Sequence, residues 1–137
     1  MVEYFDHTAD IGMHITASSL PELFAEAGRG LFALIIENLA EVQFTGVAEF
    51  RLGPRPLDYL LFDWLKELLY RFDQGHEVLG EFKLAVSAET GLTATMRSAP
   101  LDPNLHQLDH EVKAITYHEL VVRPTANGWE ARVILDI

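Results

Sequence analysis

Residues 57–72 read LDYLLFDWLKELLYRF and carry the clearest periodic pattern in the chain. Apolar side chains recur every three or four positions, which is the spacing of one face of an α-helix. This stripe consists of Leu57, Leu60, Leu61, Trp64, Leu65, Leu68, Leu69 and Phe72. Such a helix has to bury its apolar face against another layer of the protein, and Gly75 suits the position just after its end.

A second helix is predicted at about 20–37, because Ser19-Leu20-Pro21-Glu22 forms a capping-box pattern. The serine can accept a hydrogen bond from the third backbone N–H, and proline suits the first turn, where its missing N–H costs nothing. Apolar residues at helical spacing follow this start.

The remaining sequence alternates apolar and polar residues and predicts about seven strands. They fall within 2–17, 42–52, 79–89, 91–98, 111–118, 119–125 and 129–136, while 99–110 reads as a loop. Strands and helices do not alternate regularly, which favours the α+β class. We therefore expect a mainly antiparallel sheet of about seven strands with two amphipathic helices packed on one side. The length of 137 residues predicts a single domain, residues 1–137.

Composition excludes several classes of site. The net charge of −11 leaves no basic footprint of the kind that direct nucleic-acid binding requires. The absence of cysteine excludes disulfides and thiolate metal sites, and makes the cytoplasm the default location. No apolar run approaches the ~20 residues that span a bilayer, and the first residues lack a signal-peptide pattern.

Three stretches carry groups that could do chemistry. The first, Asp6-His7-Thr8-Ala9-Asp10-Ile11-Gly12, holds two acids, a histidine and a threonine within five residues. His7 and Asp10 suit a site there, but a polar strand edge or turn would have the same residues. In the second, 111–120, strand alternation puts His118 on a largely apolar face, where a half-buried structural histidine is the more common outcome. Lys113 falls on the opposite face, and could hold an anion or simply be a solvated edge lysine.

The third stretch, RVILDI at 132–137, ends in Asp136 and in Ile137, which carries the α-carboxylate. Hard divalent cations such as calcium and magnesium prefer oxygen ligands of this kind. A frayed tail is the alternative. Spacing alone does not bring Asp10 and Asp136 together, and pattern alone supports only a soluble α+β domain with a candidate cation site.

In order along the chain, five segments resemble the archease family. They are HTADIG (7–12), LPELFAEAGRGLF (20–32), LLFDWLKELLYRFD (60–73), EVKAITYHEL (111–120) and WEARVILDI (129–137). The resemblance implies a small acidic protein that is not an enzyme itself. It implies a cytoplasmic cofactor of the RNA-splicing ligase RtcB in transfer-RNA splicing and RNA repair, which stimulates guanylylation and turnover of the ligase. RNA would be reached only indirectly, and no membrane would be involved.

Carried over by position, the resemblance implies a divalent cation held by Asp10, Asp136 and Ile137. Calcium is expected in crystals, and manganese or magnesium are further candidates. Lys113, His7 and His118 would take part in activating the partner. Family members often have a polar residue in place of Phe62 and asparagine in place of Lys66, and we expect both positions to lie away from the site.

Two other functions stay open at this stage. One is a stand-alone metal-dependent hydrolase that uses His7 or His118 as a base beside the cation. No nucleophile or phosphate-binding motif accompanies these histidines in the sequence. The other is a general chaperone-like module that binds clients through Tyr59 and Phe62, although these side chains could equally be a second buried face of their helix.

Overall fold

The computed structural model describes residues 1–7 and 9–137. In chain order the elements are β1 Val2–His7, β2 Asp10–Ala17, α1 Leu20–Ile35, the 3₁₀ turn η1 Leu39–Glu41, β3 Gly46–Leu52, α2 Leu57–Gly75, β4 Glu77–Ser87, β5 Gly91–Pro100, β6 Ala114–Ile115, β7 Val121–Thr125 and β8 Gly128–Asp136. Among the described residues, none of the helices combines the length and the apolar character that a membrane crossing requires.

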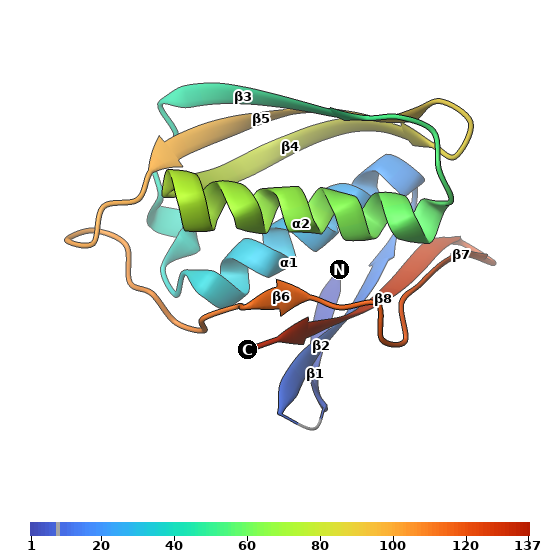
Figure 1. The fold of residues 1–137 in the computed structure, drawn as a ribbon, viewed down its shortest axis with the longest axis horizontal. Helices are drawn as coiled ribbons and strands as arrows, with labels where there is room; N and C mark the ends of the chain where they lie inside the picture. The colour runs from blue at the N-terminus through green and yellow to red at the C-terminus, as the bar shows by residue number, and fades with distance from the viewer. Residues whose placement is uncertain (8) are drawn as a thin grey trace.

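Two antiparallel sheets enclose the two helices (Figure 1). The five-stranded sheet has the order β1-β2-β8-β6, with β7 also paired to β8, and the three-stranded sheet has the order β3-β5-β4. Helix α1 contacts β4 on one side and β2 and β8 on the other, and α2 contacts β4, β6 and β7. Both helices are therefore shared by the two sheets.

The α+β class, the antiparallel pairing and the two helices are confirmed. The arrangement differs in detail from the expected single sheet, because the strands number eight within the described residues and divide between two sheets. Alternation reveals which face of a strand is apolar, but it does not reveal which strands share hydrogen bonds. Apolar residues on more than one side of α2 fit its position between two sheets.

The start of α1 follows the predicted capping pattern. Ser19 has extended backbone angles, and its hydroxyl oxygen accepts a hydrogen bond from the N–H of Glu22 at 3.3 Å. This bond satisfies one of the backbone donors that a helix start leaves free.

The apolar stripe of α2 forms the centre of the core. Trp64 is completely buried, and its ring contacts the rings of Phe50 in β3 and Phe82 in β4. Its indole N–H donates to the carbonyl of Phe24 in α1 at 2.9 Å, so the buried polar atom is satisfied. This one side chain therefore joins both helices to the three-stranded sheet.

The segment before β7 departs most from the prediction. Only Ala114–Ile115 forms a strand where 111–118 was expected, and β7 begins at Val121 rather than at 119. His118 and Glu119 lie in a turn, and Glu119 has a φ of 54°. Side chains in such a turn do not alternate between two faces, so the expected positions of both residues were wrong.

Candidate functional site

One row of residues crosses four strands of the five-stranded sheet. His7 of β1 is the register partner of Asp10 in β2, Asp10 is the partner of Asp136 in β8, and Asp136 is the partner of Ala114 in β6. Register partners project from the same face of an antiparallel sheet. The fold thus places Asp10 beside Asp136, although almost the whole chain separates them in sequence.

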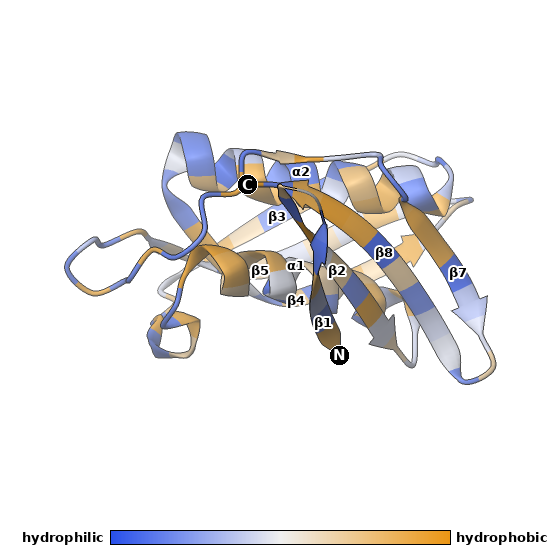
Figure 2. Ribbon diagram, turned by 90° about the horizontal axis from the view of Figure 1, so that it is seen from below, coloured by the Kyte–Doolittle hydropathy of each residue, from blue (hydrophilic) through white to orange (hydrophobic). Residues whose placement is uncertain are grey.

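This row lies on the face of the sheet that points away from the helices. In β2, Met13 and Ile15 are completely buried against the core, so the alternate positions Asp10, Gly12 and His14 face outward. Figure 2 shows the sheet from below, with β1, β2, β8 and β7 in front of the helices. The candidate site therefore lies where β8 ends, outside the core.

Asp10 and Asp136 are neighbouring acidic residues, and few positively charged groups lie near them. Directly opposed residues in an antiparallel pair have Cβ atoms about 4.5–5.5 Å apart, and like charges in that position repel each other. Among the described residues neither carboxylate lies within 4 Å of a lysine or arginine nitrogen, and the one ion pair of Asp10 is with His7, whose Nδ1 lies 3.5 Å from Oδ2. A bound cation would relieve this repulsion, so the residues present fit a cation site.

Ile137 follows Asp136 in sequence, and Lys113 precedes Ala114, the register partner of Asp136 in β6. The backbone N–H of Lys113 donates to the carbonyl of Asp136 at 2.7 Å, which ties the segment before β6 to the end of β8. The Lys113 side chain is exposed and makes no ion pair within the part of the chain that the structure describes. Ile137 is half-buried and packs against the core, which holds the residue after Asp136 in place.

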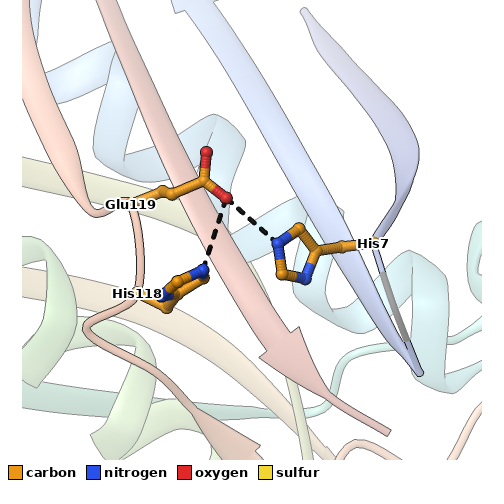
Figure 3. A group of neighbouring side chains, drawn as sticks. All are labelled: His7, His118 and Glu119. Atoms are coloured by element: carbon orange, nitrogen blue, oxygen red, sulfur yellow. Dashed lines mark ion pairs between the residues drawn. The ribbon is translucent and has the colours of Figure 1, made fainter.

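A second cluster adjoins the row at His7. Its Nε2 lies 3.1 Å from Oε2 of Glu119, and the Nε2 of His118 lies 3.6 Å from the same oxygen (Figure 3). The two imidazole rings are in edge-to-face contact, with centroids 5.1 Å apart. The other oxygen of Glu119 lies 3.4 Å from Nη2 of Arg132 in β8. Glu119 therefore connects the turn before β7 to both β1 and β8.

Residue type and resemblance selected His7, Asp10, His118 and Asp136, and the resemblance implied that the two aspartates share one cation. The structure places Asp10 beside Asp136 and His118 against His7. Sequence reasoning missed Glu119, because alternation placed that residue on the face opposite His118. It also predicted a half-buried His118, whereas 63% of this side chain is exposed, since the turn carries it away from the apolar face. No local signal could have revealed Glu119, because a glutamate at positive φ has no sequence pattern of its own.

The expectation that Phe62 lies away from the site was wrong. Its ring stacks on that of Tyr117 with centroids 3.8 Å apart and an interplanar angle of 13°. Tyr117 directly precedes His118, so this helix residue supports the turn that carries the second cluster. The helical pattern could not reveal this contact, because it depends on where the segment before β7 crosses α2.

The chain matches known proteins along its whole length. The model of the Archease protein family (MTH1598/TM1083) matches residues 2–137. "Protein archease" of Methanosarcina acetivorans is 34% identical over 139 aligned residues, covering 98% of this chain and 94% of the relative. The protein of the same name from Pyrococcus furiosus is 32% identical, covering 98% of this chain and 97% of the relative.

Two solved structures are similar in fold. The solution structure of Methanobacterium thermoautotrophicum protein 1598 has a TM-score of 0.79 and 29% identity, over 99% of this chain and 98% of its own. The crystal structure of a Thermotoga maritima archease, described as a possible chaperone, has a TM-score of 0.70 and 23% identity. The match covers 100% of this chain and 98% of that one. The family-model match over nearly all residues, together with these relatives, shows that the chain belongs to the archease family.

Proposed function

We propose that this protein is a divalent-cation-binding activator of the RNA-splicing ligase RtcB and does not itself turn over a substrate. Family membership supports the proposal, since the resemblance described above implies that archeases stimulate guanylylation of this ligase. The observation that carries the cation-binding part is the cross-strand pairing of Asp10 with Asp136 on the outer face of the five-stranded sheet.

The two aspartates supply the hard oxygen ligands that calcium, magnesium and manganese accept. We assign Ile137 as a further ligand, as the resemblance implies, through a carboxylate oxygen next to that of Asp136. When bound, the cation supplies positive charge that offsets the repulsion between the carboxylates. The role of the chain's own residues is to hold this charge rigidly at the end of β8, where Lys113 is tied to Asp136.

The charge of the whole protein suits an encounter with a basic partner. A net charge of −11 would steer it toward the positively charged surface that an RNA-handling ligase requires. Such steering raises the association rate and weakens as salt is added. We assign Lys113 and His118 to contact with the partner, because both are exposed. The backbone of Lys113 is hydrogen-bonded to Asp136, and His118 contacts His7, the register partner of Asp10.

The experiment that tests this function measures guanylylation of the purified ligase over a range of manganese concentrations. The wild-type protein should raise the rate, and Asp136→Asn should abolish the stimulation because the cation pair is broken. Glu89→Gln is the matched control, since it removes one negative charge from an exposed turn between β4 and β5. Thermal unfolding of each variant confirms that its fold is retained.

The two parts of the proposal fail separately. If the wild-type protein leaves guanylylation unchanged at every manganese concentration, the assignment as an activator is wrong. If the wild type and Asp136→Asn stimulate equally, the activator assignment stands but the cation site is not required for it.

The chaperone-like alternative loses part of its basis in the structure. It relied on Tyr59 and Phe62 as exposed binding residues, but Phe62 is only 7% exposed, beneath Tyr117. Tyr59 and Tyr117 are about half exposed, and their rings contact each other. This small aromatic pair is a weaker basis for a general client-binding surface than the site on β2 and β8 is for cation binding.

A further inference from the structure

We propose that His7, His118 and Glu119 form a second metal site, selective for zinc or a metal of similar preference and separate from the aspartate pair. Two imidazole nitrogens and one carboxylate oxygen are a ligand set typical of zinc sites with an open fourth position. Calcium and magnesium prefer all-oxygen ligands, so the two neighbouring sites would differ in the metal they select.

The spacing of the three ligand atoms suits a tetrahedral ion. Zinc–nitrogen and zinc–oxygen bonds of about 2.0–2.2 Å at tetrahedral angles place neighbouring ligand atoms about 3.3 Å apart. Oε2 of Glu119 lies 3.1 Å from Nε2 of His7 and 3.6 Å from Nε2 of His118. One ligand atom from each residue lies within 4.8 Å of the others, so small side-chain rotations complete the geometry.

The two oxygens of Glu119 already have different partners. Oε2 faces both histidines, while Oε1 lies 3.4 Å from the guanidinium of Arg132. The arginine therefore fixes the rotation of the carboxylate and leaves one oxygen for a metal. Figure 3 shows the carboxylate between the two imidazole rings, which come from β1 and from the turn before β7.

His7 also has a group that can orient it. Its Nδ1 is buried and has no hydrogen-bond partner of good geometry, but Oδ2 of Asp10 lies 3.5 Å away. Histidine ligands commonly donate their other ring N–H to a carboxylate, which sets the tautomer and strengthens the ligand. A slight rotation of Asp10 would satisfy the buried nitrogen and leave Nε2 free to bind the metal. Asp10 would then belong to one site as a ligand and support the other as an orienting group.

The test is a calorimetric zinc titration of the chelator-treated full chain, with saturating calcium present to fill the aspartate site. The wild type should bind one zinc per chain. His118→Ala and Glu119→Gln should each weaken this binding more than tenfold, and Asp136→Asn should bind zinc as the wild type does. Asp10→Asn should weaken zinc binding about tenfold or more, the range for loss of an orienting group.

The matched control is His14→Ala. His14 lies on the same outer face with its Nε2 3.2 Å from a carboxylate oxygen of Glu130, but no second histidine is within reach of that pair among the described residues. Its loss should leave zinc affinity unchanged. The proposal is overturned if the wild type binds no zinc, or if His118→Ala and Glu119→Gln bind it as tightly as the wild type. It is also overturned if His14→Ala weakens binding as much as they do. None of these outcomes bears on ligase stimulation.

Discussion

The polar side chains on the outer faces of the two sheets differ in solvent exposure, although both sheets pack against the same two helices. In the three-stranded sheet β3 alternates regularly, and side chains of β4 and β5 reach solvent: Glu81 is 62% exposed and Arg97 is 44% exposed. On the five-stranded sheet the outward His7 and Asp10 are only 28% and 25% exposed. Partly covered polar groups lie close to one another there, whereas those on the smaller sheet are solvated.

The difference follows from how each sheet is assembled. In the smaller sheet β4 and β5 form a local hairpin, and β3 joins its edge. In the larger sheet β2 from the beginning of the chain pairs with β8 from its end. Pairing of distant segments collects polar residues from separate parts of the sequence on one face. In this fold the candidate site therefore lies where segments from the beginning and the end of the sequence pair.

Gly12→Ala, on the larger sheet, should lower the free energy of unfolding more than Gly53→Ala, Glu130→Gln or Glu81→Gln. A Cβ at Gly12 would lie 2.0 Å from Cζ of Phe5, whose ring covers this position on the larger sheet. Overpacking of this kind costs about 1–3 kcal/mol. Chemical denaturation should show that loss, and zinc affinity should fall because β1 carries His7.

Gly53→Ala, just after β3 of the smaller sheet, is the control. Its Cβ would meet no atom nearer than Nη2 of Arg55 at 3.9 Å. We expect stability to stay constant or to rise by up to about 1 kcal/mol, because alanine restricts the unfolded chain. Equal losses in the two variants would contradict the claim that Gly12→Ala destabilises the protein through the clash with Phe5.

Glu130→Gln should have a smaller effect that depends on pH. Hydrogen bonds from Arg123 and His14 hold the pKa of Glu130 below its ordinary value of 4.5. A lowered pKa stabilises the native state above the pKa of the unfolded carboxyl, and this contribution is lost as the pH falls through the folded pKa. The variant should therefore be less stable than the wild type at pH 7, and the difference should shrink toward pH 3. Urea denaturation at both pH values measures it.

Glu81→Gln is the corresponding change on the smaller sheet. Glu81 lies 3.8 Å from Arg97 and both side chains are solvated, so their ion pair contributes roughly 0–1 kcal/mol. We expect the free energy of unfolding at pH 7 to fall less in Glu81→Gln than in Glu130→Gln. A larger loss in Glu81→Gln at pH 7 would contradict the comparison between the two faces.

Much of the fold could be predicted from local patterns. The stripe on α2 and the capping serine of α1 are short-range features, and the structure confirms both. The division into two sheets could not be predicted, because strand partners depend on contacts between distant segments. The position of the helices between the sheets could not be predicted either. Their apolar surface shows that they are buried, but it does not show which strands cover them.

The candidate site divides in the same way. Asp10 and Asp136 could be selected from residue type and resemblance, but only the register of β2 with β8 makes them neighbours. Glu119 was missed because the turn at 118–119 interrupts strand alternation. The contact of Phe62 with Tyr117 was missed because it joins a helix to an irregular segment.

The central claim is that Asp10 and Asp136 hold one divalent cation together. The most direct test is calorimetric titration of calcium into the wild type, Asp10→Asn, Asp136→Asn and the double variant. Each single substitution should weaken binding at least tenfold, or about 1.4 kcal/mol. The double variant should lose less than the sum of the two, because both residues contact the same ion. Wild-type calcium affinity in either single variant would contradict the claim.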